Sequence, residues 1–246
     1  MKVFPLGRNK SVFDKNDYNL KDFIPRNAYF TTVSEKNWEF PVAPLNQEET
    51  PHCTGFSMAN FGINYPTSTL YTDIDAHSFY YKCKEMDGEP NQENGSSIRT
   101  VAKVLKNTRR VSAYAFAPDM ATIKWWLLNK GPLIVGTTWT SDMFIVKKDN
   151  TINIGDDIVG GHAYLLNEWR SDNYIGIQNS WGYDWGKNGK AYISASDFEK
   201  LFVYDGEALT AVELDSDTEV TTPHSCILID IINNIFGMDK VKIHIK

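Results

Sequence analysis

The spacing of apolar residues predicts four helices in the first half of the chain. In each of four segments, apolar side chains recur every three or four positions, and capping or turn-forming residues close the run. The expected helices begin at Cys53, cover 74–86, run through 98–105 behind a serine cap, and cover 120–129. Cys53 is therefore expected at the amino end of a helix.

After residue 131 the pattern changes to short apolar runs separated by turn residues, which is typical of strands. The expected strands are Leu133–Thr138, Thr151–Ile154, His162–Leu166, Tyr174–Ile177 and Ala191–Ile193. Helices followed by strands predict an α+β fold, and we expect a cleft where the two halves meet.

These changes in pattern divide the chain into four parts. Residues 1–27 are polar and irregular and are expected to form an N-terminal arm, and 28–130 are expected to form a mainly helical lobe that contains Cys53. Residues 131–207 form a strand-rich lobe, and 208–246 form a C-terminal extension with strand-like alternation near its end. We expect the extension to add an edge hairpin, to dock the arm or to contact a partner.

Composition and charge narrow the possible functions. Apolar residues make up 42% of the chain and aromatic residues 13%, as in a folded globular protein. The net charge is −6 and no basic cluster offsets it, so a nucleic-acid partner is not expected. The first residues lack the apolar run of a signal peptide, and no segment has the length of a membrane span. We therefore expect no membrane association.

The chain has three cysteines, Cys53, Cys83 and Cys226. An odd and sparse set cannot form a disulfide framework, which favours a cytoplasmic or otherwise reducing compartment. No two of them have the spacing of a metal-binding or redox pair, so we expect no metal site. Cys83 lies on the apolar face of a predicted helix and is expected in the core.

One combination of residues points to nucleophilic catalysis. A thiol attacks as its thiolate, and both the positive end of a helix and a neighbouring imidazolium lower its pKa. Cys53 meets the first condition, and His162 from the strand half could supply the second. Asn179 could hold the ring of His162 without removing its charge, beneath a shield formed by Trp181. The developing oxyanion needs donors, and Gln47 is a natural candidate beside the Cys53 N–H.

The order and local context of these residues resemble those of the papain-like cysteine peptidases. The matching pieces are Ala43-Pro44-Leu45-Asn46-Gln47, Cys53, Gly161-His162-Ala163, Asn179-Ser180-Trp181-Gly182 and Trp185-Gly186-Lys187-Asn188-Gly189. The resemblance implies a two-lobed fold in which a helical lobe carrying the cysteine packs on a β-barrel-like half. It also implies polypeptide substrates, no cofactor, nucleophile Cys53, acid and base His162, orienting Asn179 and oxyanion donor Gln47.

The resemblance also implies which residues line the substrate cleft, and the chain departs from the family pattern in places. Gly95, Ala163 and Trp181 match positions where the family contacts its substrate. His162 lies closer to Cys53 in sequence than the roughly 130–150 positions of the papain branch, so we expect a compact member. Only 52 residues precede Cys53, too few for a long prosegment. We expect either no prosegment or an arm that acts as a short regulator.

Two other functions remain open at this stage. The same acyl-enzyme passed to an amine would make a transpeptidase or ligase, and a chain that kept only the fold would be an idle scaffold.

Several residues have simpler structural readings. His52 is expected at the surface, His77 has no expected partner, and Trp125 and Trp126 are expected in the core. The acidic run 213–219 is expected to be a solvated loop.

Overall fold

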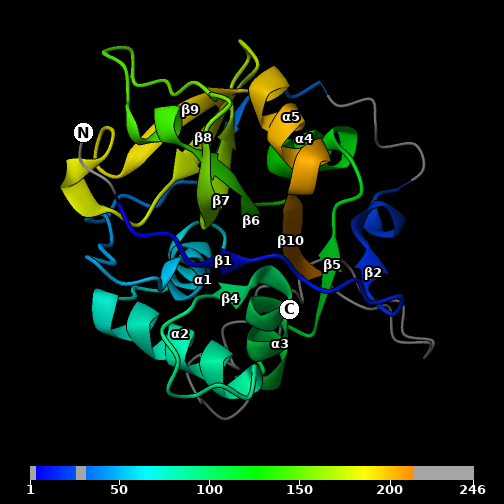
Figure 1. Cartoon of the computed structure of the whole chain (residues 1–246). Helices are drawn as coiled ribbons and strands as arrows, with labels where there is room; N and C mark the ends of the chain where they lie inside the picture. The colour runs from blue at the N-terminus through cyan, green and yellow to red at the C-terminus, as the bar shows by residue number, and fades with distance from the viewer. Residues whose placement is uncertain (1–3, 26–31, 213–246) are drawn as a thin grey trace, which may run out of the picture.

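The computed structural model describes residues 4–25 and 32–212 of the chain. Helices α1, α2 and α3 gather on one side of the molecule, and the larger sheet with α4 and α5 forms the other side (Figure 1). Strand β1 (Arg8–Asn9), near the N-terminus, runs between the two sides. The expected α+β architecture with two lobes is confirmed.

The helices begin and end close to where the apolar spacing predicts. They are α1 (Cys53–Ile63), α2 (Asp73–Met86), α3 (Ile98–Asn107), α4 (Met120–Asn129) and α5 (Ala195–Asp205), with 3-10 turns at Leu20–Phe23, Ser141–Phe144 and Gly182–Asp184. Side chains that cap the backbone explain four of the starts, and at α5 the cap is Ser194. Thr72 and Asp75 form a capping box at α2, Ser97 caps α3, and Asp119 caps α4. Cys53 is the first residue of α1, as expected.

The strands form one large sheet and one short pair. The sheet has the order β2-β5-β10-β6-β7-β8-β9, with β3 (Lys36–Asn37) paired to β7. Its members are β2 (Tyr18–Asn19), β5 (Ala113–Phe116), β6 (Leu133–Thr140), β7 (Ile158–Trp169), β8 (Tyr174–Gln178), β9 (Lys190–Ser194) and β10 (Glu207–Val212). Among the described residues the two end strands, β2 and β9, do not pair with each other, so the expected barrel is open. In the short pair, β1 lies parallel to β4 (Ser96–Ser97).

Three features differ from the sequence-based expectations. Residues 151–154 form no strand, because only Thr151 makes an isolated bridge, to Tyr192. Strand β5 lies in the part expected to be helical, and α4 packs against β7 in the other half. Strand β10 begins the expected extension but lies inside the sheet, between β5 and β6. Cys226, the acidic run and the expected hairpin lie outside the described residues.

Two apolar clusters form the core. One joins the strands to α4 and α5 and includes Trp125 and Trp126, which are buried as expected. The other packs α1, α2 and α3 on the sheet and includes the buried Cys83. Strand β10 contributes Ala208 to the first cluster and Leu209 to the second.

Within residues 4–25 and 32–212, every helix is too short or too polar to cross a membrane.

Candidate active site

The two lobes bring together Cys53, His162 and Asn179, the residues for which the sequence predicts a catalytic role. Cys53 begins α1, and its thiol interacts with the backbone of Ala163, the residue after His162. His162 lies in β7 opposite Thr137 of β6. Its Nε2 lies 2.7 Å from Oδ1 of Asn179, which follows β8. The other ring nitrogen, Nδ1, has no hydrogen-bond partner among the described residues and is available for proton exchange.

Aromatic rings enclose the imidazole of His162. Trp181 stacks on it with ring centroids 4.5 Å apart and an interplanar angle of 19°. The ring of Trp139 lies edge-on to the imidazole, with ring centroids 4.9 Å apart, and its centroid lies 5.2 Å from that of Trp181. Both indoles are buried, so the His162–Asn179 hydrogen bond is shielded from water. The sequence pattern indicated Trp181 but missed Trp139, whose position at the end of a strand carries no motif of its own.

Gln47 is buried and tied to the loop that carries Asn179. Its Oε1 accepts a hydrogen bond of 2.6 Å from Ser180, and its backbone N–H donates to the Ser180 carbonyl at 2.7 Å. Its Nε2 donates to the carbonyl of Thr50 at 2.7 Å and to that of Pro5 at 3.2 Å. The Gln47 amide therefore already donates to a main-chain carbonyl from the N-terminal arm.

A network of buried amides joins α1 to the strands beneath the site. Asn64 and Asn167 both donate to the Gln178 side chain, at 2.7 and 2.8 Å. Gln178 donates to Asn60 of α1, which itself donates to the Asn179 carbonyl at 3.3 Å. Because these groups are buried and bonded to one another, they set the position of α1 relative to Asn179. The sequence reasoning missed them, since they are scattered along the chain.

Residues 4–9 of the arm lie across the site, and we call them the covering segment. Gly7 donates to the Gly161 carbonyl at 3.2 Å and accepts from the Ser96 N–H at 2.9 Å. The ring of Phe4 stacks on Trp181 at 4.6 Å. The thiol of Cys53 also interacts with the Gly7 backbone, and its exposed fraction is zero. The sequence treated this part as irregular, although the apolar run Phe4-Pro5-Leu6 is a signal that it is buried.

The covering segment fits the walls of the cleft closely. A Cβ atom at Gly7 would lie 1.9 Å from the Pro51 carbonyl oxygen, so only glycine fits there. A Cβ atom at Gly95 would lie 2.1 Å from the Gly7 oxygen, and Gly95 also has a φ of +81°. Gly95, Ala163 and Trp181, the three residues expected to line the cleft, therefore all lie beside this segment or the residues that it covers.

Burial controls the protonation of the two central groups. It raises the pKa of the Cys53 thiol to about 12, although backbone groups of Ala163 and Gly7 oppose the rise. Burial also lowers the pKa of His162 to about 4, and the hydrogen bond to Asn179 offsets this only in part. With the covering segment in place, both side chains are neutral at pH 7.

A second cluster of histidines lies beside the start of α1. The residue before Cys53 is His52, and its Nδ1 lies 2.7 Å from Nδ1 of His77 while its Nε2 lies 2.5 Å from Glu93. His52 also stacks on Tyr80 at 3.7 Å and is 1% exposed. The expectation of a surface His52 is wrong, because three groups distant in sequence enclose its ring. His77, for which no partner was expected, is one of them.

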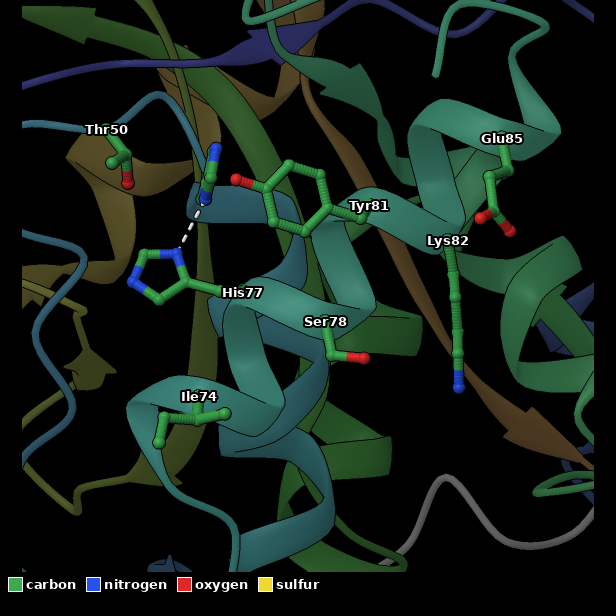
Figure 2. A pocket seen from close by; sticks show the side chains of 8 residues that line it. Thr50, Ile74, His77, Ser78, Tyr81, Lys82 and Glu85 are labelled. Atoms are coloured by element: carbon green, nitrogen blue, oxygen red, sulfur yellow. Dashed lines mark hydrogen bonds between the residues drawn. The ribbon is translucent and has the colours of Figure 1, made fainter. Parts of the chain in front are cut away.

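This cluster borders a recess on the outer face of α2. Figure 2 shows the residues that line it, which include His77, Ser78, Tyr81, Lys82 and Glu85. Its volume is about 590 Å³. Burial lowers the pKa of His52, while Glu93 opposes that shift. The part of the chain that the structure describes contains no group of three or more His, Cys, Asp or Glu residues arranged to hold a metal ion.

Solved structures share this fold over most of the chain. Xylellain, a cysteine protease from Xylella fastidiosa, superposes with a TM-score of 0.68 and 15% identity, covering 87% of this chain and 99% of that one. A procathepsin B from Trypanosoma congolense gives a TM-score of 0.61 and 14% identity, covering 83% and 86% of the two chains.

Sequence comparisons agree with the structural ones. A cathepsin B-like cysteine proteinase 6 of Caenorhabditis elegans is 32% identical over 81 residues, which are 32% of this chain and 21% of that protein. The match thus spans about a fifth of that relative. The sequence model described as papain family cysteine protease matches residues 49–202, which contain Cys53, His162 and Asn179. This chain belongs to the papain family of cysteine proteases.

Proposed function

We propose that the protein is a cysteine peptidase that hydrolyses peptide bonds through an acyl-enzyme on Cys53. The observation that carries the proposal is the hydrogen bond between His162 Nε2 and Asn179 Oδ1, 2.7 Å long, next to a thiol at the start of a helix. The amide leaves Nδ1 of His162 as the atom that can exchange a proton with the thiol. A polypeptide is the substrate class that this arrangement suits.

The reaction runs in two halves. His162 takes the Cys53 proton, and the thiolate attacks the carbonyl carbon of the scissile bond. The imidazolium then gives its proton to the leaving amine as the C–N bond breaks, which leaves a thioester on Cys53. In the second half His162 takes a proton from water, and the resulting hydroxide attacks the carbonyl carbon of the thioester. The C–S bond then breaks, and the imidazolium of His162 returns the proton to the sulfur of Cys53.

Gln47 is the proposed donor to the oxyanion that forms in each half. Its Nε2 donates to the Pro5 carbonyl of the covering segment, and a substrate carbonyl in the same place would receive the same hydrogen bond. Ser180 holds the amide oxygen of Gln47, so that the donor nitrogen keeps its direction. The stacking of Trp181 on His162 is proposed to keep water from the Asn179 hydrogen bond.

The described arrangement is proposed to be the resting form. Cys53 has no exposed surface and its thiol has a raised pKa, so neither a substrate nor an alkylating agent has access while the covering segment stays. The arm then acts as a short regulator that must move before catalysis. In a latent enzyme, movement of the arm exposes a reactive thiol at Cys53. In an idle scaffold, the same movement would produce no reactive thiol.

Substitution of Cys53 tests the proposed reaction. Cys53→Ala is expected to abolish cleavage of a mixed peptide library and to leave the circular dichroism spectrum and the unfolding temperature near those of the parent. Cys83→Ala, at another buried thiol, is the matched control and is expected to keep cleavage. Undiminished cleavage by Cys53→Ala would refute the assignment of the nucleophile.

Loosening the arm tests the proposed resting form. Arg8→Ala removes the ion pairs of Arg8 with Asp205 and Glu207 and is expected to speed alkylation of Cys53 by iodoacetamide. Lys10→Ala removes the same charge from an exposed position two residues along and is expected to leave the rate near that of the parent. Mass spectrometry of the peptide that contains Cys53 measures the alkylation rate. Equal rates in the two variants would contradict a regulatory arm.

A further inference from the structure

The residue before the nucleophile is a buried histidine whose side chain does not cap the helix that it precedes. His52 is the N-cap residue of α1 and is 1% exposed, but its side chain makes no cap hydrogen bond. Side chains favoured at this position cap the helix with an oxygen, and histidine is not among them. The ring of His52 is instead held by three side chains from elsewhere in the chain, His77, Tyr80 and Glu93. We call these four residues the His52 cluster.

The contacts of His52 fix both the protons and the orientation of its ring. Its Nε2 lies 2.5 Å from Oε2 of Glu93, and because a carboxylate only accepts, Nε2 carries a hydrogen and donates it. Its Nδ1 lies 2.7 Å from Nδ1 of His77, a distance that requires one N–H and one lone pair between the two rings. Tyr80 stacks on one face of the imidazole, with ring centroids 3.7 Å apart. Both nitrogens and one face are therefore held, and the ring cannot turn without breaking a contact.

This fixed ring lies one peptide bond from the backbone donor to the oxyanion. The carbonyl of His52 and the N–H of Cys53 belong to one planar peptide unit. The carbonyl accepts the N–H of Phe56 at 3.2 Å, which is the first hydrogen bond of α1. The Cys53 N–H lies at the first position of the helix, where the helix itself supplies no acceptor, so it suits a developing oxyanion. Phe56 thus holds one side of the peptide unit, and the ring of His52 fixes the backbone that enters it.

The His52 cluster also links this peptide unit to the loop that leads into β4. Glu93 lies in that loop, three residues before Ser96, whose N–H donates to the covering segment at 2.9 Å. The Tyr80 hydroxyl accepts from the N–H of Gly95 at 3.1 Å while its ring stacks on His52. Two side chains therefore join the start of α1 to a loop that contacts the occupant of the site.

The same loop has a second attachment that does not involve the histidine. The ammonium of Lys84 donates to the side chains of Glu89 and Asn94 at 2.7 and 2.6 Å, and to the carbonyl of the next residue at 3.1 Å. The Lys84 side chain is 1% exposed, so these bonds are shielded from water. A substitution of Glu93 would therefore release the ring without releasing the loop.

We propose that His52 is a positioning residue for the peptidase reaction, and that the His52 cluster directs the Cys53 N–H towards the oxyanion. The inference rests on the proposed peptidase function. His52 does not touch the reacting atoms and acts through the peptide unit that it shares with Cys53. If the ring were released, this unit could turn, and a misdirected donor would stabilise the transition state less. Because the oxyanion forms only during the reaction, the loss is expected in kcat rather than in KM.

Steady-state kinetics of the full chain on one peptide test this role. Glu93→Ala removes the acceptor from His52, whereas His52→Phe keeps a ring against Tyr80 and loses both hydrogen bonds. Each variant is expected to lower kcat by about tenfold and to leave KM within about twofold of the parent value. Glu93→Gln keeps an oxygen that accepts from His52 and is expected to retain most of the rate.

Glu85→Gln is the matched control, at an exposed carboxylate that lines the recess on α2, and it is expected to keep both constants. Thermal unfolding shows at which temperature every variant is folded, and the kinetics are measured there. If His52→Phe does not fold, Glu93→Ala provides the measurement, because the Glu93 side chain is 52% exposed. A cluster that only stabilises the fold would lower the unfolding temperature and leave kcat unchanged.

Nuclear magnetic resonance observes the Cys53 amide without turnover. The full chain labelled with heavy nitrogen in cysteine alone gives three backbone amide signals, because the sequence contains three cysteines. Cys53→Ala identifies the signal of Cys53. We expect Glu93→Ala to shift this signal and Glu85→Gln to leave it in place, with the other two cysteine signals as the reference for general changes.

The outcomes separate the positioning role from the peptidase function. If the parent cuts the peptide and both Glu93→Ala and His52→Phe keep its kcat, the positioning role is overturned and the peptidase function stands. A Cys53 signal that stays in place in Glu93→Ala would also overturn the positioning role. If the parent cuts no peptide, the peptidase function fails, and the role of His52 in the reaction fails with it.

Discussion

At the scale of single residues, the hydrogen bond between His162 and Asn179 is the contact on which the proposed chemistry depends most. The order of Cys53, His162 and Asn179 along the chain predicted that they would meet, and His162 and Asn179 do so at 2.7 Å. Their motifs are local and could be read from the sequence. The partners of His52 could not, because His77 and Glu93 reach it only after α2 and the following loop have folded.

Removal of the Asn179 amide should lower kcat. In Asn179→Ala the ring of His162 loses the acceptor that sets its orientation, and a misplaced catalytic group costs about 10- to 100-fold in rate. KM is expected to change little, because Asn179 does not contact the scissile bond in the proposed mechanism. Steady-state kinetics on one peptide measures both constants, with Asn153→Ala, at an exposed position, as control. A change in KM alone would argue against an orienting role.

At the scale of elements, the covering segment and the strands around it control access to the site. The segment pairs in parallel with β4, bonds to Gly161 in β7, and is held by Arg8 at the junction of α5 and β10. No periodic pattern marks six residues that follow a groove rather than forming a helix or a long strand. The sequence therefore indicated an arm and a possible regulator, but not where the arm lies.

The closed position of the segment should weaken in mild acid. His162 has a pKa of about 4 while it is covered, against an ordinary value of 6.5. Opening lets the ring take up a proton, so the stability of the closed form is fully present above pH 6.5 and is lost as the pH falls towards 4. For each pH unit in this range, the equilibrium constant between the closed and the open form falls by at most about tenfold.

Hydrogen exchange can measure this opening. The Gly7 and Ser96 amides, which bond across the segment, should lose protection between pH 6.5 and 4.5 after correction for the intrinsic exchange rate. Amides of β8 in the core provide the reference. Constant protection of Gly7 and Ser96 over this range would show that His162 does not control the opening.

At the scale of the whole molecule, β10 joins the two halves. It pairs with β5 on one side and β6 on the other, and its successive residues Ala208 and Leu209 enter different apolar clusters. The sequence analysis placed most of this strand in the extension 208–246, because that part lies partly beyond the resemblance to the papain-like peptidases. Its central place results from pairing with strands about 70 and 95 residues earlier, which only the folded chain brings together.

A cavity in β10 should therefore destabilise the whole fold. Leu209→Ala is expected to lower the free energy of unfolding by about 2–5 kcal/mol, because the side chain is fully buried. Val203→Ala, at a side chain that is 77% exposed in α5, should change it by less than about 0.5 kcal/mol. Urea unfolding followed by tryptophan fluorescence measures both. A cost for Leu209→Ala no larger than that of the control would contradict a central role for β10.

The sequence by itself determined the helices of the first half, most strands of the second, the α+β class and the three residues expected to perform the chemistry. These features depend on local periodicity, caps and short motifs, which neighbouring residues specify. Only the tertiary structure decided that the N-terminal segment covers Cys53, that Arg8 pairs with two carboxylates, and that burial keeps the thiol and the imidazole neutral. Those features depend on groups that are distant in sequence and on exclusion of water, which arise only when the lobes and the arm pack together.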